Sequence, residues 1–450
     1  MKMNDLTTPI LDFVRGYAES GAARFHMPGH KGAGLLGFEA LDITEIDGAG
    51  ELYAPEGPIA LSEANASALF GADTYYSCEG SSLAIRAMLK LALEGADAPV
   101  VLAGRNAHRA FLSAAALLGF DVEWLHPAAG EAYHSCAVSA GAVDAALSRL
   151  GGRCRAVYLT SPDYLGHLSD IAAIAGVCHR RGALLLVDNA HGAYLKFLPD
   201  GSRHPMDLGA DLCCDSAHKT LPALTGAAYL HVHPRMKLDA RRVKSALALF
   251  GSSSPSWLIL QSLDACNPLL RDLPPRLAEC LEGLEGLKAA LTAHGYALVG
   301  DEPMKLTLAA RPFGVTGDDL AARLREKGVV CEFHDPDYCV LMPTPWNAER
   351  DLARLRDALL SIPRRDALPG DAPAYRANRI ALAVREAAFA ARETLPVEAC
   401  LGRVLAGSAL ACPPCVPIAV CGEVIDEGVI ERLRYYGIAE CEVVKTERQF

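Results

Sequence analysis

Short apolar runs alternate with helical periodicity through much of the chain. Continuous apolar runs predict buried strands, and apolar residues spaced three and four apart predict helices. Strands are expected at residues 100–103, 121–126, 156–160, 183–188 and 226–233, and helices at 110–119, 168–182 and 257–296. Because such alternation is typical of a parallel sheet with both faces covered, we expect an α/β fold.

Changes in this pattern divide the chain into four parts. The opening stretch is rich in Gly and Pro, which favours an extended arm. Short strands around a helix at 318–328 indicate a small α/β domain, which a linker rich in Pro and Asp follows. The last part has expected helices at 378–392 and 427–436. We therefore predict an arm (1–60), a large cofactor-binding domain (61–299), a small domain (300–366) and a C-terminal domain (367–450).

Composition excludes several classes of protein. The 450 residues carry 43 Lys and Arg against 54 Asp and Glu, a net charge of −11. Nucleic-acid scaffolds and polybasic membrane binders need a positive surface, so we expect neither partner. No signal peptide and no run of about 18 apolar residues are found. With 15 scattered Cys, we expect a cytoplasmic protein with reduced thiols.

A carboxylate and a lysine follow two of the predicted strands. Asp188 ends the apolar run 183–188, and Lys219 comes about 30 residues later in Ser-x-His-Lys-Thr. A buried carboxylate needs a partner. Pyridoxal phosphate needs a Lys for its Schiff base and an acid for its ring nitrogen, so the pair favours that cofactor. Taken alone, a strand-end Asp is more often a turn residue, and a His-Lys pair more often lies on the surface.

A phosphate site is expected upstream of this pair. Gly80, Ser81 and Ser82 precede a predicted helix. A glycine lets a ligand approach the backbone, and a helix N-terminus attracts anions. By itself the Gly-Ser-Ser segment is more often an ordinary helix cap; its order before Asp188 and Lys219 favours the phosphate site.

Eight segments of the chain occur in an order that resembles one known family. They are MPGHKG, DITEIDGAGELYAPEGPI, EGSS, GRNAHRAF, SPDYLG, VDNAHGAY, SAHKTLPALTG and GSSSPS. The set resembles the ornithine/lysine/arginine decarboxylases over about residues 6–430, in the short form without an N-terminal wing domain. The resemblance implies fold type I: an aspartate-aminotransferase-like large domain with a mainly parallel sheet, and smaller C-terminal α/β domains.

The resemblance also implies roles for the matched residues. Lys219 matches the Schiff-base lysine, Asp188 the acid that holds the pyridinium N–H, and His108 the imidazole that stacks on the ring. Ser252, within one position, matches a phosphate contact that the neighbouring subunit donates. Further contacts with pyridoxal 5'-phosphate are implied for Gly80, Ser81, Ser82, Ala190, His191, Ser216 and His218.

The implied reaction is decarboxylation of arginine, lysine or ornithine to an amine and CO2, a step of polyamine biosynthesis. Sites of this fold lie at a dimer interface, so the resemblance implies a homodimer or a higher homo-oligomer. Either His108 or Lys219 could return a proton to Cα. Two alternatives stay open: another fold type I reaction such as aminotransfer, and a cofactor-binding relative without catalysis.

Five positions depart from the family pattern. Glu79 stands where Asn is usual, Asp163 where a Thr-like residue is usual, and Asp215 and Gly226 where Gln is usual; Asn189 replaces an acid. Three of these changes put carboxylates near the expected phosphate and phenolate. Two like charges at ~4 Å repel by roughly 1 kcal/mol in water and about 4 at an effective dielectric of 20. We expect these side chains to turn away, to be protonated, or to retune the site.

Two further groups of residues invite weaker interpretations. Cys412 and Cys415 have C-x-x-C spacing, but no second pair or His follows at a matching distance, so we expect no metal. His26, His30 and Lys31 could either line the site from the arm or be ordinary loop residues.

Overall fold

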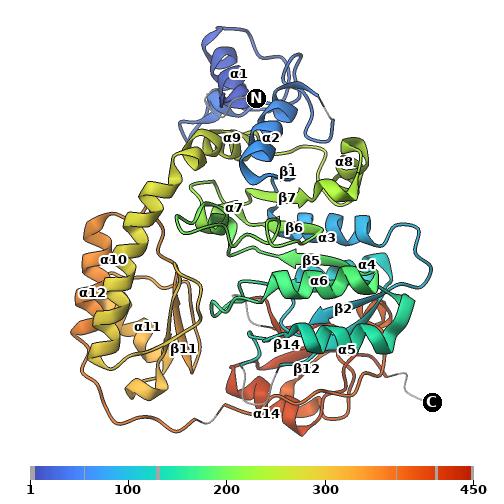
Figure 1. Cartoon of the computed structure of the whole chain (residues 1–450), viewed down its shortest axis with the longest axis vertical. Coiled ribbons are helices and arrows are strands. Elements are labelled where there is room, and N and C mark those ends of the chain that lie inside the picture. The colour runs from blue at the N-terminus through green and yellow to red at the C-terminus, as the bar shows by residue number, and fades with distance from the viewer. Residues whose placement is uncertain (1–5, 55, 128–131, 371, 411–413, 447–450) are drawn as a thin grey trace. The chain divides into compact units, whose positions relative to one another are not determined.

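The computed structural model describes residues 6–54, 56–127, 132–370, 372–410 and 414–446 (Figure 1). The chain forms two compact units, and each is assembled from two separate stretches of sequence. The first unit comprises Met1–Gly95 and Ile171–Ala278, and the second comprises Ala96–Asp170 and Glu279–Phe450. Among the described residues, no helix has the length and apolar character needed to cross a membrane.

The first unit contains a sheet in the strand order β1-β7-β6-β5 together with covering helices. Its strands are β1 (Asp73–Ser77), β5 (Leu184–Asp188), β6 (Leu212–Asp215) and β7 (Ala228–Val232). Its helices are α1 (Pro9–Glu19), α2 (Gly57–Phe70), α3 (Gly80–Ala92), α6 (Ile171–Arg181), α7 (Ala217–Thr220), α8 (Ala240–Ala248) and α9 (Trp257–Arg271). A further helix, α10 (Leu273–His294), continues into the second unit.

Strand register places the ends of these strands at one edge of the sheet. β5 and β6 are parallel, with Asp188 opposite Cys214. β7 is antiparallel to both β6 and β1, and it pairs Ala228 with Ser77. The carboxyl ends of β1, β5 and β6 therefore meet at the edge where β7 begins. In α/β sheets, this edge is where ligands bind.

The N-terminal arm contains a helix, α1, that the sequence pattern did not predict. Backbone N–H groups of Ile10 and Leu11 each donate to Asp264 Oδ2 at 2.9 Å, and the Ser62 hydroxyl donates to Oδ1 at 2.5 Å. Asp264 thus supplies the acceptor that orphan N–H groups at a helix start require. Burial raises the pKa of Asp264 to about 6. The arm is anchored to α9 by this carboxylate.

A buried ion pair ties α8 to α2 and to the arm. Lys244 and Glu63 side chains are about 1% and 6% exposed, with Nζ and Oε1 2.5 Å apart. The same ammonium donates to Leu52 O at 2.6 Å, and the Tyr76 N–H donates to Glu63 at 2.9 Å. Each charged group therefore has a hydrogen bond in addition to its ion-pair partner, and such additional bonds are needed to bury an ion pair.

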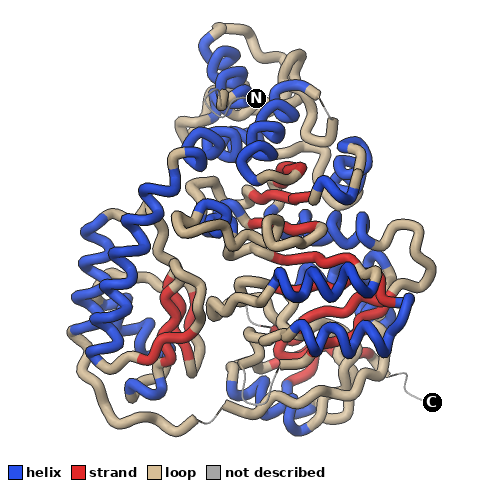
Figure 2. Tube along the Cα trace, viewed as in Figure 1, coloured by secondary structure: helices blue, strands red, loops and turns tan. Residues whose placement is uncertain are grey.

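The second unit contains parallel strands in the order β4-β2-β3 and a separate antiparallel sheet in the order β10-β11-β9-β8. The parallel part has β2 (Val100–Gly104), α4 (Arg109–Leu118), β3 (Asp121–Leu125), α5 (Ala140–Leu150) and β4 (Cys154–Thr160). The antiparallel part has β8 (Ala297–Val299), β9 (Leu306–Ala309), α11 (Gly317–Glu326), β10 (Phe333–His334), β11 (Tyr338–Leu341) and α12 (Glu349–Leu360). Helices α11 and α12 lie beside this small sheet (Figure 2).

The C-terminal segment of the second unit differs from its sequence prediction. The helix expected at 378–392 is wrong, because only α13 (Val384–Phe389) is helical. Ile380 instead bridges Glu423, and the N–H of Ala381 donates to Gly422 O, so pairing with a distant segment overrides local helix propensity. The other elements are β12 (Arg392–Pro396), β13 (Ala409–Leu410), β14 (Pro417–Ala419), α14 (Glu427–Tyr435) and β15 (Glu440–Val444).

Most of the remaining predicted strands and helices are confirmed within a few residues, whereas the helix expected at 257–296 is two helices, α9 and α10. The apolar runs became β2, β3, β4, β5 and β7, and the expected helix at 427–436 is α14. The pattern missed β1, α5 and α12, and it missed the short strands β12 and β15. These last strands pair with each other across about 50 residues of chain, so local periodicity carries little signal for them.

We predict that Lys244→Met destabilises the first unit by about 3–5 kcal/mol, because it leaves the Glu63 carboxylate buried without its counter-charge. Denaturant unfolding followed by tryptophan fluorescence measures the change. Glu63→Gln in the same chain removes the orphaned charge and keeps an acceptor for the Tyr76 N–H, so the double variant should recover much of the loss. A double variant no more stable than Lys244→Met would contradict this account.

Candidate functional site

Lys219 lies at the edge of the first unit's sheet where β5 and β6 end. It belongs to the single turn α7, which follows β6 directly. Its Nζ is 3.0 Å from His191 Nε2, and His191 is 6% exposed while Lys219 is half-buried. An amine beside a nearly buried imidazole can exchange a proton with it, as a nucleophilic lysine requires.

Asp188 ends β5 and is only 2% exposed. Its Oδ1 accepts the Ala190 N–H at 3.2 Å and the Cys214 thiol at 3.7 Å. The structure thus brings Asp188, Ala190, His191 and Lys219 into one unit, on two chain segments that leave adjacent parallel strands. A buried carboxylate here can stabilise a protonated ring nitrogen.

Two hydroxyls meet at the start of α3. The Ser216 hydroxyl donates to Ser81 Oγ at 2.9 Å, which joins the β6–α7 turn to the β1–α3 turn. The N-cap residue Glu79 makes no side-chain capping hydrogen bond to α3. In the first turn the Gly80 N–H is bonded to a backbone carbonyl, and Ser82 is half-buried. The helix dipole, the N–H groups of the first turn and the two hydroxyls are together suited to binding a phosphate.

A close backbone contact explains why position 226 is a glycine, which the sequence alone did not show. Gly226 has a φ of +99°, and a Cβ at this position would lie 2.8 Å from Cys78 O. Its carbonyl accepts the Gly80 N–H at 2.8 Å. Glycine therefore lets the strand β7 approach the start of α3, and a Gln here would be strained.

Glu79 is the first of three carboxylates expected to disturb the cofactor. Its Oε1 accepts the Ser252 N–H at 2.6 Å, so the segment 251–254 is held next to the start of α3. Burial, with the nearby Glu79 charge, raises the pKa of Tyr53 to about 12. Tyr53 is a neighbour of the site that sequence reasoning missed.

Asp215, the second of these carboxylates, is fully buried and pairs within the first unit. Its Oδ2 accepts from His204 Nε2 at 3.0 Å and from His231 Nε2 at 3.1 Å, and its Oδ1 accepts from Asn189 Nδ2 at 2.7 Å. Burial alone would raise the pKa of Asp215, but the two imidazoles outweigh it and hold that pKa well below its ordinary value. The carboxylate is ionised, and both its oxygens are occupied.

Asp163, the third carboxylate, belongs to the second unit and organises its own loop. It accepts from the Ser135 hydroxyl at 2.6 Å, His167 Nδ1 at 2.9 Å and the Gly166 N–H at 2.8 Å. Burial opposes its ionisation, but the His167 and Ser135 hydrogen bonds outweigh this and lower the pKa of Asp163. All three carboxylates thus accept hydrogen bonds from other residues of the protein.

The remaining predicted residues are placed as follows. His108 is in the second unit, where it caps α4 by accepting the Ala110 N–H at 3.2 Å. His218 Nδ1 donates to Ala227 O at 2.9 Å. Cys412 lies outside the described residues.

Residues of the arm bond mainly to one another. His26 Nε2 lies 2.5 Å from the Tyr17 hydroxyl, and His30 Nε2 lies 3.1 Å from Asp42. Lys31 donates to His26 O at 2.5 Å. These contacts are those of ordinary loop residues.

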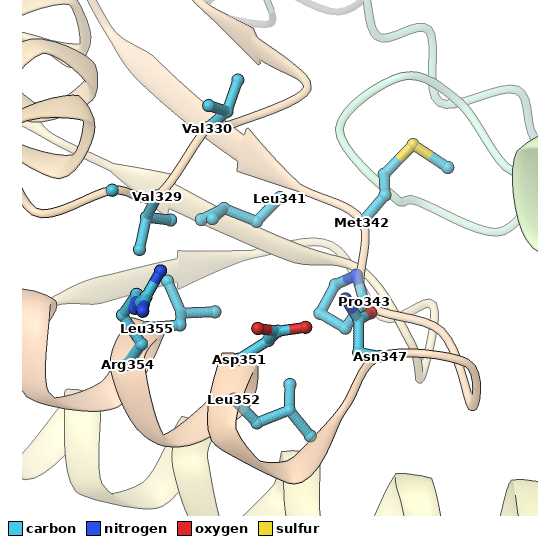
Figure 3. Close-up of a pocket in the computed structure, with 11 residues that line it drawn as sticks. Val329, Val330, Leu341, Met342, Pro343, Asn347, Asp351, Leu352, Arg354 and Leu355 are labelled. Carbon is cyan, nitrogen blue, oxygen red and sulfur yellow. The ribbon is translucent and has the colours of Figure 1, made fainter.

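A separate pocket of about 210 Å³ lies in the second unit (Figure 3). Residues of α12, including Asp351 and Leu355, face Leu341 of β11 and Val329 of the segment that follows α11 across it. None of the residues predicted from sequence line this pocket. The first unit's sheet edge therefore stays the candidate site.

The residues at this edge fit pyridoxal phosphate. Lys219 supplies the amine for covalent attachment, and Asp188 supplies a buried acid for the ring nitrogen. Ser81, Ser216 and the N-terminus of α3 supply hydroxyl and N–H donors for the phosphate. This donor set is suited to one dianion and one pyridinium, and each member sits on a strand end or helix start that the sheet register fixes.

Comparisons with known proteins agree with this chemistry. The family model described as "Orn/Lys/Arg decarboxylase, major domain" matches residues 8–292. A Bacillus subtilis (strain 168) protein described as arginine decarboxylase is 29% identical, with 94% of this chain and 92% of that protein aligned. A Methanothermobacter thermautotrophicus protein described as pyridoxal phosphate-dependent is 29% identical over 160 residues, covering 35% of this chain and 40% of its own.

Similarity to solved structures shows the fold. The lysine decarboxylase of Francisella novicida superposes with a TM-score of 0.80 at 16% identity, covering 98% of this chain and 82% of its own. The predicted α/β fold of the fold type I enzymes is thus confirmed.

We predict that Ser216→Ala weakens pyridoxal phosphate binding about tenfold or more, because a charge-assisted hydrogen bond to the phosphate is lost. Equilibrium dialysis of the cofactor-free protein measures the dissociation constant. Ser245→Ala, which changes an exposed serine of α8, is the matched control and should bind as the unaltered protein does. Equal affinity of Ser216→Ala and the control would remove Ser216 from the phosphate site.

Proposed function

The chain belongs to the ornithine/lysine/arginine decarboxylase family, and we propose that it uses pyridoxal phosphate to remove the α-carboxylate of arginine, lysine or ornithine. The resemblance noted in the sequence is confirmed by the family match, and the chain is an amino-acid decarboxylase. The observation that carries the proposal is the 3.0 Å pair of Lys219 and His191 beside the buried Asp188.

The chemistry assigns a task to each residue. When bound, pyridoxal phosphate supplies a ring that accepts the electron pair left at Cα as CO2 departs. Asp188 would hold a proton on the ring nitrogen, and its own burial is compensated by that positive charge. Ser81, Ser216 and the start of α3 would hold the phosphate.

Proton movement in the proposed reaction involves Lys219 and its neighbour. Lys219 must lose a proton before its amine can react, and His191 Nε2 at 3.0 Å is the group positioned to accept it. When its amine is not bound to the cofactor, Lys219 would be able to return a proton to Cα. His108, the second candidate for this step, would stack on the cofactor ring.

The substrate class rests on family membership and charge. The family name, the arginine decarboxylase relative and the net charge of −11 favour a cationic amino acid. We further propose a cytoplasmic homodimer or larger homo-oligomer that acts in polyamine biosynthesis. In it, Ser252 would approach the partner's phosphate, and the four sequence-defined parts would act as its domains.

The contacts of the three unusual carboxylates favour catalysis over loss of activity. Glu79, Asp163 and Asp215 accept hydrogen bonds from other residues of their own units. None of these contacts requires a vacant or repulsive cofactor site. A cofactor-binding relative without catalysis would need another structural cause.

Release of CO2 with identification of the amine product tests this function. We expect the protein loaded with pyridoxal phosphate to decarboxylate one of arginine, lysine and ornithine at least tenfold faster than leucine, the neutral control. Lys219→Ala should lose this activity. An amine-free keto-acid product would instead indicate aminotransfer, and no turnover of any substrate by fully loaded protein would contradict the proposal.

A further inference from the structure

A fully buried cluster of polar side chains lies beneath the candidate site. His204, Asp215 and His231 are each 0% exposed. The Phe70 ring packs against both imidazoles, with centroid distances of 5.5 Å to His204 and 4.5 Å to His231. Asn189, also 0% exposed, completes the cluster by donating to Asp215. A cluster so isolated from water has to satisfy its own charge.

The hydrogen bonds of His204 show which of its ring nitrogens carries the proton when the imidazole is neutral. The Met206 N–H donates to His204 Nδ1 at 3.3 Å, so a neutral His204 carries its proton on Nε2 and donates it to Asp215. Burial lowers the pKa of His231 and the Asp215 charge opposes this effect, while the second ring nitrogen, Nδ1, lies 2.9 Å from Thr74 Oγ1. A metal bound at Nε2 would need His204 to carry its proton on Nδ1, where the Met206 N–H already points. The geometry favours a carboxylate with three N–H donors over a metal site.

This cluster joins the two segments that carry the catalytic groups. Asn189 follows Asp188 at the end of β5, and Asp215 precedes Ser216 at the end of β6. Beside the side-chain bond, the Asn189 N–H donates to Cys214 O at 2.9 Å. The Asn189–Asp215 bond thus spans the point where both segments leave the sheet, four residues before Lys219.

The surroundings of Asn189 leave it little freedom. A Cβ on Gly192 would lie 2.0 Å from Asn189 Oδ1, so the side chain fills the space beside the glycine. The Cys213 thiol lies 3.8 Å from Asp215 Oδ1, and the Cys214 thiol lies 3.7 Å from Asp188 Oδ1. Burial raises the pKa of both thiols well above the ordinary value, so both are neutral. The lowered pKa of Asp215 assigns the negative charge of this cluster to that carboxylate.

We propose that Asn189 and Asp215 are positioning residues. Their hydrogen bond holds the segment that follows β5 to the segment that follows β6. Because the carboxylate is at position 215 and the amide at position 189, no second negative charge lies next to Asp188. The inference rests on the proposed function. A charge at position 189 would adjoin Asp188 in the chain and strengthen its hold on a proton. At position 215 the same charge is instead stabilised by three N–H donors.

An exchange of the two residues separates hydrogen bonding from charge. N189D sets two carboxylates against each other at the 2.7 Å contact. In the double variant N189D/D215N, the amide oxygen at position 215 can accept from both imidazoles, and its nitrogen can donate to the carboxylate at position 189. The number of hydrogen bonds is kept, and the charge moves to the residue after Asp188.

Thermal unfolding of the cofactor-free full chain tests whether the Asn189–Asp215 hydrogen bond holds the two segments together. We expect N189D to lower the melting temperature by roughly 5 °C or more, since like charges are forced together without water. The exchange variant should regain most of this loss. N347D, the same substitution at an exposed turn, is the control and should melt as the unaltered protein does. A stable N189D, or an exchange variant no better than N189D, would overturn this positioning role.

The bound cofactor's absorbance tests the charge placement. In the exchange variant, we expect the pH midpoint of the absorbance change to shift by about one unit or more from the unaltered protein, while the melting temperature is near normal. An unchanged midpoint would overturn this part, and one equivalent of zinc in the purified protein would overturn the whole assignment. Failure of the unaltered protein to bind pyridoxal phosphate would refute the proposed function, whereas the melting comparison needs no cofactor.

Discussion

A carboxylate cannot be buried alone, and the first unit is organised around meeting this constraint. Several of its acids are mostly or fully buried, and the ones described above accept hydrogen bonds from other residues. Glu63 faces Lys244, Asp264 binds the start of α1, and Asp215 takes three N–H groups. Asp188 receives the Ala190 N–H and a thiol. Asp188 ends β5 and Lys219 follows β6, so the ring nitrogen of a bound pyridoxal phosphate would add a positive charge beside this buried acid.

Strand register turns this constraint into a site. Because β5 and β6 are parallel and β7 returns antiparallel between β6 and β1, three strand ends deliver their polar segments to the same edge. One segment carries the acid, one the lysine and one the start of α3. Short segments after the strands are therefore enough to bring these groups together. Side chains such as Asn189 then hold neighbouring segments at the distance that the strand pairing sets.

The sequence predicted the chemical groups of the site better than their surroundings. Asp188 and Lys219 stand out because a strand-end acid and a lysine are costly to bury, which short-range pattern can reveal. The partners of Asp215 and Glu79 could not be read in this way, because His231 and Ser252 lie 16 and 173 residues away. The false helix at 378–392 has the same origin, since its competitor is the distant segment at Gly422.

Identifying the lysine that binds pyridoxal phosphate is the most direct test of the proposed site. The protein loaded with pyridoxal phosphate would be reduced with borohydride, digested and mapped by mass spectrometry. If Lys219 binds the cofactor, we expect one pyridoxyl group per chain, on the peptide that contains Lys219. A pyridoxyl group on another lysine, or its spread over exposed lysines at low yield, would contradict the site described for this fold.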